Sequence, residues 1–134
     1  ILNEKQRLNI ITNLVNFYKL DLILDPKTSH LSPGNFVKFN FICKEYDIMP
    51  TSNFIKNLSL LLDVYKKKRD ILIINLLFYL ADQYLIQIKD KNLIKTDKIF
   101  EIKNFIMNSL NNFINYNINQ ISLINSINEK LNYE

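Results

Sequence analysis

The chain contains few of the residues that most catalytic and metal sites require. Its 134 residues include one glycine, one cysteine, one histidine and no tryptophan. Gly34 alone cannot build a glycine-rich phosphate loop, and one His with one Cys cannot supply the ligands of a zinc site. The carboxylates are scattered rather than paired as general acid and base catalysis requires. We therefore expect no catalytic residue, no metal and no cofactor, and a protein that is not an enzyme.

The single histidine and the single cysteine do not indicate a nucleophilic site. His30 lies among turn-forming residues, and Cys43 lies on the apolar stripe of an expected helix, so we expect the first at the surface and the second in the core. A lone cysteine cannot form an internal disulfide, which favours a reducing, cytoplasmic location. The opening residues show no signal-peptide pattern, and because residue 1 is not Met we expect it not to be the natural start.

Glycine and proline are scarce too, and they fall where a helical protein needs turns. Between them, apolar residues recur every three or four positions, the spacing of one helix face; the first such stripe runs on to Tyr18 and Leu22, and the last includes Ile118 and Ile121. Asn3 with Gln6 is predicted to cap the first helix, and Thr51 or Ser52, and Thr96, are predicted to cap later ones. The pattern predicts helices over about residues 3–24, from Ser32 and Pro33 to before Pro50, from Thr51 or Ser52 to Arg69, over 71–88, and from Thr96 to about 133. Since no strand pattern, repeat or low-complexity linker interrupts them, the prediction is an all-α single domain spanning residues 1–134.

Two of these elements are unusual. The stretch 71–88 has one polar, non-aromatic side chain, Asn75, in its first eleven residues, so we expect a buried central helix with no face given to water. Asp82 and Gln83 interrupt it short of the roughly 18 to 20 apolar residues that a membrane span needs. The last segment, after the polar connection 89–95, loses helix propensity around Asn117 to Asn119 and is predicted as one long helix, straight or kinked.

Two turn segments, HLSPGNFVKF (30–39) and YKKKRDILIINL (65–76), resemble parts of EF-hand loops. With FVKFNFICKEYDIMP and LLLDVYKKKRDILIINLLFYLADQYL, the chain resembles the calcium-free EF-hand-like modules of ciliary and cytoskeletal proteins, such as the tubulin polymerization-promoting proteins. The resemblance implies a four-helix EF-hand-like pair over about residues 3–88, with a C-terminal helical extension over about 96–133. Lys67 and Arg69 stand at positions where calcium ligands would be required, so the pair is expected to bind no calcium.

Positive charge is concentrated in one place, the run Lys66, Lys67, Lys68 and Arg69. It has two readings: a solvated helix end, or a contact with an acidic surface such as that of tubulin, a phosphate backbone or anionic lipid. Without interleaved exposed aromatics the run is weak evidence for nucleic acid, and lipid binding would need more charge or an exposed amphipathic wedge.

The last helix has a nearly uncharged, asparagine-rich polar face, so we expect it to depend on packing or on a partner. Phe105, Phe113 and Tyr116 are the residues expected in that contact, either in the groove of the same chain's EF-hand-like pair, against an outside partner, or as ordinary core.

The resemblance and the absences together predict a non-enzymatic protein-interaction or scaffolding domain of a cytoskeletal assembly, with tubulin or another cytoskeletal component as a candidate partner. The alternative is a basic helical domain associated with nucleic acid. The oligomeric state and the identity of the partner stay open.

Overall fold

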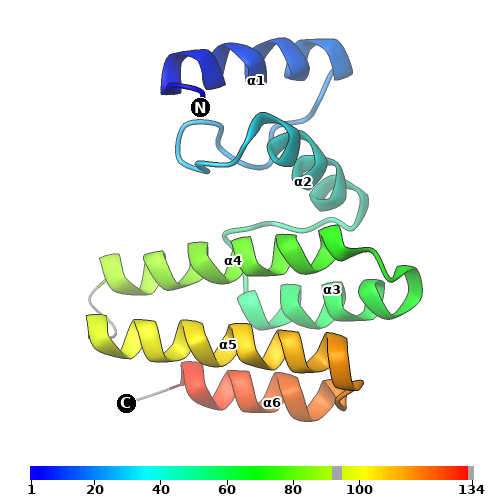
Figure 1. Cartoon of the computed structure of the whole chain (residues 1–134), viewed down its shortest axis with the longest axis vertical. Coiled ribbons are helices and arrows are strands. Elements are labelled where there is room, and N and C mark those ends of the chain that lie inside the picture. The colour runs from blue at the N-terminus through cyan, green and yellow to red at the C-terminus, as the bar shows by residue number, and fades with distance from the viewer. Residues whose placement is uncertain (92–94, 133–134) are drawn as a thin grey trace. The chain divides into compact units, whose positions relative to one another are not determined.

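The computed structural model describes residues 1–91 and 95–132, and the regular structure within them is entirely helical, as predicted. The six helices are α1 (Glu4–Tyr18), α2 (Pro33–Glu45), α3 (Phe54–Lys68), α4 (Ile71–Asp90), α5 (Thr96–Tyr116) and α6 (Gln120–Leu131). Figure 1 shows their order along the chain. Residues 92–94 of the predicted polar connection, and residue 133 of the predicted extension, lie outside the described residues.

The helices group into two compact units, Ile1–Pro50 with α1 and α2, and Thr51–Glu134 with α3 to α6. The sequence predicted a single domain in which an EF-hand-like part ends near residue 88 and a helical extension follows. That division stays a prediction.

Within the first unit, α1 and α2 pack on each other and two polar side chains hold their long connection. The guanidinium of Arg7 donates to the backbone carbonyls of Leu31 and Pro26 and to Ser29 Oγ. On α2, Asn40 Oδ1 accepts from the backbone N–H groups of Ile23 and Leu24, at 2.8 and 3.0 Å. These bonds satisfy backbone groups that a non-helical segment would otherwise leave unpaired.

Helix α1 is shorter than the predicted 3–24. Lys19 adopts the left-handed conformation (φ 50°, ψ 48°), and the N–H of Leu20 bonds the Val15 carbonyl, which ends the helix. Beyond the turn, Leu20 and Leu24 are buried outside any helix. The chain therefore changes direction at Lys19, ahead of the two buried leucines.

The predicted caps hold at the start of the chain and fail further along. Asn3 and Gln6 form a reciprocal capping box, and Ser32 caps α2 with Pro33 at its first position, as predicted. Helix α3 is instead capped by Asn53, whose Oδ1 accepts from the N–H of Lys56, so Thr51 and Ser52 were the wrong choice. Thr96 is the first residue of α5 and does not cap it.

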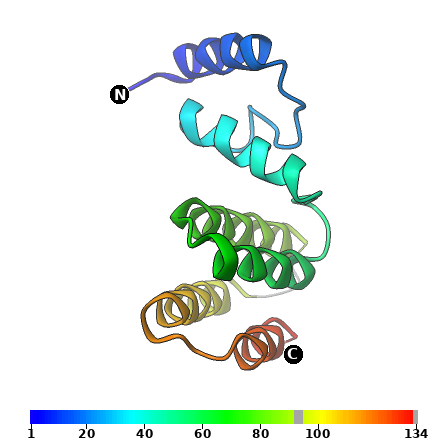
Figure 2. The same ribbon diagram turned by 90° about the vertical axis from the view of Figure 1, so that its right-hand side faces the viewer.

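The second unit is a closed ring of four helices: α3 packs on α4, α4 on α5, α5 on α6, and α6 back on α3. Successive helices are antiparallel, as the four helices of this unit show in Figures 1 and 2. This is the connectivity of an up-and-down four-helix bundle. Its core residues come from all four helices and include Leu58, Leu77, Ile106 and Ile127, each fully buried.

Helix α4 confirms the predicted helix at 71–88 but not its burial on every side. Eight of its residues are buried: Ile73, Ile74, Leu76, Leu77, Leu80, Ala81, Leu85 and Ile88. Asn75 is exposed, and so are Ile71 and Ile86. In a ring of four helices each member has two neighbours, so α4 is one wall of the bundle and not a post surrounded by the others. By length and composition alone α4 could cross a bilayer, a test that the core helix of a bundle also passes.

The prediction of one long C-terminal helix is wrong, because the segment forms two helices, α5 and α6. The chain stops being helical at Asn117 to Asn119, where propensity was predicted to weaken, but it reverses there instead of bending. Asn117 adopts the left-handed conformation (φ 51°, ψ 48°), and Asn119 caps α6 through the N–H of Ser122. The two resulting helices pack against each other and against α4 and α3.

The segment 65–76, which resembles an EF-hand loop in sequence, is mostly helical in the structure. Helix α3 continues to Lys68 and α4 begins at Ile71, so residues 65–76 contain two non-helical residues, Arg69 and Asp70, where a twelve-residue loop was expected. Asp70 caps α4 by accepting from the N–H of Leu72 at 3.0 Å. This tight turn leaves no space for a loop that surrounds a cation.

Candidate functional site

The basic run lies at the turn between α3 and α4. Lys66, Lys67 and Lys68 form the last turn of α3, where cations favour the negative end of the helix dipole, and Arg69 follows in the left-handed conformation. All four are exposed. The Arg69 guanidinium lies 5.6 Å from the centre of the Tyr65 ring. Within the described part of the chain, Lys66 and Lys67 form no ion pair.

The turn between α5 and α6 lies at the same end of the second unit as the basic run. Gln120, at the start of α6, donates through Nε2 to Asp63 Oδ1 at 2.7 Å and to the Ser59 carbonyl at 3.3 Å. The rings of Tyr65 and Phe113 are 6.3 Å apart. The Gln120 bonds hold the start of α6 against α3, and the contact of Tyr65 with Phe113 joins α3 to α5 across the core of the bundle. Both turns lie at the same end of the unit (Figure 1).

The three aromatic residues expected in a helix-groove contact have three different environments. Phe113 is 4% exposed and belongs to the core of the bundle. Phe105 is half-buried, with Lys130 Nζ 5.3 Å from its ring centre. Tyr116 is 75% exposed. They therefore do not form one contact surface; Tyr116 alone lies at the end that carries the basic run.

An exposed aromatic cluster on the first unit was missed from the sequence. Phe17 and Tyr18 at the end of α1 meet edge to face at 4.9 Å, and Tyr18 meets Phe41 of α2 at 5.9 Å. Phe17 is 77% exposed, Tyr18 49% and Phe41 44%. Tyr18 was expected on the inward stripe of a longer helix. Phe17 and Phe41 fall outside the apolar stripes of their helices, and that was the signal available in the sequence.

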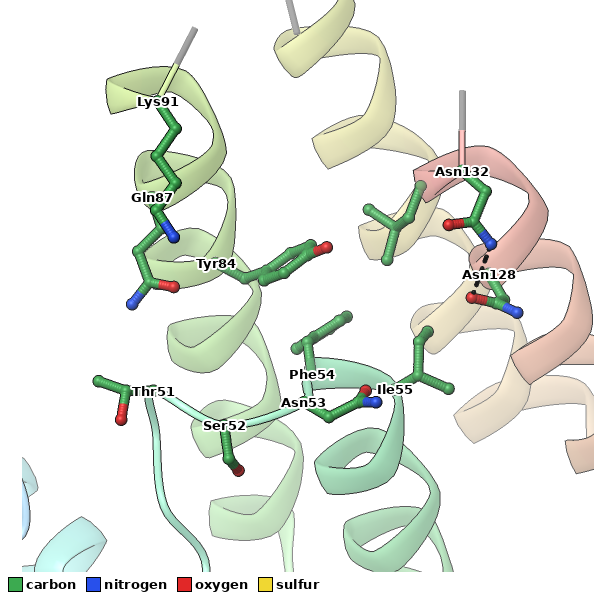
Figure 3. A pocket seen from close by; sticks show the side chains of 11 residues that line it. Thr51, Ser52, Asn53, Phe54, Ile55, Tyr84, Gln87, Lys91, Asn128 and Asn132 are labelled. Atoms are coloured by element: carbon green, nitrogen blue, oxygen red, sulfur yellow. Dashed lines mark hydrogen bonds between the residues drawn. The ribbon is translucent and has the colours of Figure 1, made fainter. Parts of the chain in front are cut away.

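A second feature that the sequence did not indicate is a cavity of about 440 Å³ in the second unit, at the start of α3 and the ends of α4 and α6 (Figure 3). Its lining offers four side-chain amides, three hydroxyls, one ammonium and three apolar side chains: Asn53, Gln87, Asn128, Asn132, Thr51, Ser52, Tyr84, Lys91, Phe54, Ile55 and Leu131. Tyr84 stacks on Phe54 with ring centres 5.3 Å apart. Asn132 Nδ2 donates to Asn128 Oδ1, and Asn53 caps α3, so several amides are already engaged.

The single histidine and the single cysteine have the environments that were expected from the sequence. His30 is exposed and Cys43 is fully buried. Burial raises the pKa of the Cys43 thiol to about 12, so the reactive thiolate is disfavoured. Across residues 1–91 and 95–132, no three His, Cys, Asp or Glu side chains lie close enough together to hold a metal ion.

Comparison with protein-family models, with curated proteins and with solved structures finds no match to this chain.

Proposed function

We propose that the chain is a non-enzymatic, protein-binding scaffold domain of a cytoplasmic assembly. The observation that supports this best is the aromatic cluster of Phe17, Tyr18 and Phe41. Exposed aromatic side chains in mutual contact are uncommon on proteins that work alone, whereas aromatic residues are enriched at the centres of protein interfaces. The three rings are held by the ends of two helices, so little side-chain freedom is lost when a partner covers them.

The test compares the proteins that co-purify with the wild-type chain and with a Phe17→Ser, Phe41→Ser variant. Both side chains are exposed, so the double variant should keep its fold while losing at least tenfold in affinity for the partner. Leu2→Ser, an exposed apolar residue ahead of α1, is the matched control. A set of co-purifying proteins that is the same for all three chains would contradict the proposal.

A cytoskeletal partner is the specific form of this proposal that the EF-hand-like resemblance suggests. Tubulin would offer an acidic surface to Lys66, Lys67, Lys68 and Arg69, which are exposed together at one turn. Sedimentation with microtubules should then bring down the wild-type chain, and Lys66→Glu with Lys67→Glu should reduce the bound fraction. The four-helix EF-hand-like pairing itself stays a prediction for residues 3–88, with its second loop replaced by a two-residue turn.

The alternative, a basic helical domain associated with nucleic acid, is favoured by one observation, the unpaired Lys66 and Lys67. Binding to duplex DNA or to RNA at low salt, falling steeply as salt is raised, would support it, because counterion release dominates phosphate recognition. If no binding is found even at low salt, the alternative fails and the scaffold proposal is unaffected.

A further inference from the structure

Two helical turns meet at one end of the second unit and present apolar side chains beside cations. The turn from α3 to α4 and the turn from α5 to α6 both face the viewer in Figure 2. Gln120 bonds Asp63, and Tyr65 lies near Phe113, so the two turns are fixed relative to each other by the bundle. We call this surface the basic end; it consists of Lys66, Lys67, Lys68, Arg69, Ile71, Tyr116, Ile118 and Ile121.

The apolar side chains of the basic end are exposed on both turns. Tyr116 and Ile121 are 75% and 70% exposed, and Ile71 and Ile118 are exposed to a lesser degree. The sequence placed Ile118 and Ile121 on an inward stripe, but the reversal at Asn117 changes the phase of α6, whose buried residues are Gln120, Leu123, Ile127 and Leu131. Tyr116 and Ile121 therefore lie exposed at this turn and contribute little to the core of the bundle.

The charge at this end is positive. The four cations of the basic run are exposed, and the two carboxylates closest to it in the sequence, Asp63 and Asp70, offset only part of their charge. Asp63 accepts from Gln120 and Asp70 accepts from the N–H of Leu72, and neither carboxylate forms an ion pair with Lys66 or Lys67 among the described residues. Lys66 and Lys67 have no carboxylate partner among the described residues. A binding surface for this end should therefore be acidic, and it should also accept apolar side chains.

We infer that the basic end binds the surface of an anionic lipid bilayer. A bilayer supplies both properties in one plane: negative headgroups attract the lysines, and the acyl boundary below them accepts Tyr116, Ile118 and Ile121. Tyrosine is favoured at that depth because its ring is apolar and its hydroxyl stays hydrated. The side chains project from two turns at the tip of a bundle, a geometry that a flat surface can contact without a matching groove. The binding is peripheral, with no helix crossing the membrane, and is a further function that does not rest on the proposed scaffold role.

The absence of tryptophan from the chain allows a direct test. Tyr116→Trp places a single fluorophore in the basic end, and Phe100→Trp places one at an equally exposed position on the first turns of the same helix, α5, away from the turn. Vesicles of phosphatidylcholine with phosphatidylserine should shift the emission of Tyr116→Trp to the blue and leave Phe100→Trp unchanged. Vesicles of phosphatidylcholine alone should shift neither.

Charge reversal and removal of the apolar side chains complete the test by vesicle sedimentation. Lys66→Glu with Lys67→Glu should lower the affinity for phosphatidylserine vesicles about 25-fold or more, because each of the two cations lost contributes about fivefold near an anionic surface. Lys89→Glu with Lys91→Glu, at the other end of α4, is the matched control. Tyr116→Ser with Ile121→Ser should weaken binding as well, at unchanged melting temperature, since both side chains are at least 70% exposed.

Three results would overturn the inference. One is failure of the wild-type chain to sediment with phosphatidylserine vesicles at low salt. Another is an equal blue shift from Phe100→Trp, which would mean that vesicles bind the chain without using this end. The third is binding of soluble polyglutamate in place of vesicles with the same dependence on Lys66 and Lys67, which would assign the basic end to an acidic protein.

Discussion

Arg7 shows how much of the first unit depends on single polar side chains. It is 8% exposed, and its guanidinium bonds groups of the connection between α1 and α2 and the carboxylate of Glu4 at 3.0 Å. From the sequence it is an ordinary helix-surface arginine paired with Glu4, because its partners in the connection lie 19 to 24 residues away. Long-range partners of this kind leave no periodic signal, which is why the sequence predicted the helices of this unit but not how their connection is held.

Replacing Arg7 by Met should lower the free energy of unfolding by about 2–4 kcal/mol, because the Leu31 and Pro26 carbonyls would lose charge-assisted donors in a partly buried site. Chemical denaturation monitored by circular dichroism measures this. Lys5→Met, an exposed position on the same helix, should change stability by less than about 0.5 kcal/mol. Equal effects of the two substitutions would show that the Arg7 contacts do not stabilise the fold.

The buried Cys43 thiol should make the free energy of unfolding depend on pH, and a variant without the thiol isolates this contribution. Its pKa is raised by burial from 9.0 to about 12, so above pH 9 the unfolded chain loses a proton that the folded chain keeps. Stability contributed by the neutral buried thiol is therefore complete below pH 9 and decreases as pH rises towards 12. Wild type should lose more stability between pH 8 and 10.5 than Cys43→Val, in which this proton is absent. Parallel losses in both chains would contradict the burial of the thiol.

At the scale of elements, the scarcity of glycine has a structural cost. Among the residues that the structure describes, five that are not glycine take positive φ: Lys19, His30, Asp47, Arg69 and Asn117. Three of these are the residues that end α1, α3 and α5. Glycine is the usual residue there, because a side chain in the left-handed region costs on the order of 1 kcal/mol.

Lys19→Gly should therefore raise the free energy of unfolding by about 0.5–1 kcal/mol, since relief of the left-handed strain exceeds the added freedom of the unfolded chain. The control is Asn9→Gly in the exposed middle of α1, which should lower stability by up to about 1 kcal/mol. Thermal denaturation measures both. If Lys19→Gly destabilises as Asn9→Gly does, the helix does not end at this turn.

Calcium should not stabilise the chain. The expected second loop is a two-residue turn, and Lys67 and Arg69 lie where ligands would stand. A cation that binds the folded state must raise the melting temperature, so titration with calcium up to millimolar concentrations should leave that temperature unchanged. A rise of several degrees that EDTA reverses would show that a calcium site exists.

The elements also show where sequence reasoning succeeds. Inward positions in the middle of helices, such as Ile11, Cys43, Leu58 and Phe113, follow from the three-and-four spacing and are all buried. The errors occur at helix ends, where the spacing carries the pattern too far: Tyr18, Leu22 and Ile121 continue an apolar stripe in the sequence but lie outside in the structure. A stripe records which residues share a helix face only as long as the helix continues.

The same limit explains why the candidate sites could be predicted only in part from the sequence. The basic run was visible because its charges are consecutive, but the apolar side chains beside it come from a turn almost fifty positions later. The aromatic cluster likewise joins Phe17 and Tyr18 to Phe41 across two helices. Sequence gives the members of such surfaces, and only the fold brings them together.

At the scale of the whole molecule, the two units carry different exposed surfaces: aromatic rings on the first, and cations with aliphatic side chains on the second. The core of each unit is formed by other, apolar side chains, and most of these exposed side chains lie outside it. A chain that binds partners through both units would act as a link between them, which is the role we propose for it.

The most direct measurement of that role is photo-crosslinking inside the native host, with p-benzoylphenylalanine introduced in place of Phe17. This most exposed member of the aromatic cluster should yield one or a few discrete protein adducts, identified by mass spectrometry. The same group in place of Lys5, exposed on the same helix but distant from the cluster, should yield none of them. Identical adduct patterns from the two positions, or no adduct from position 17, would contradict the claim that the cluster binds a protein partner.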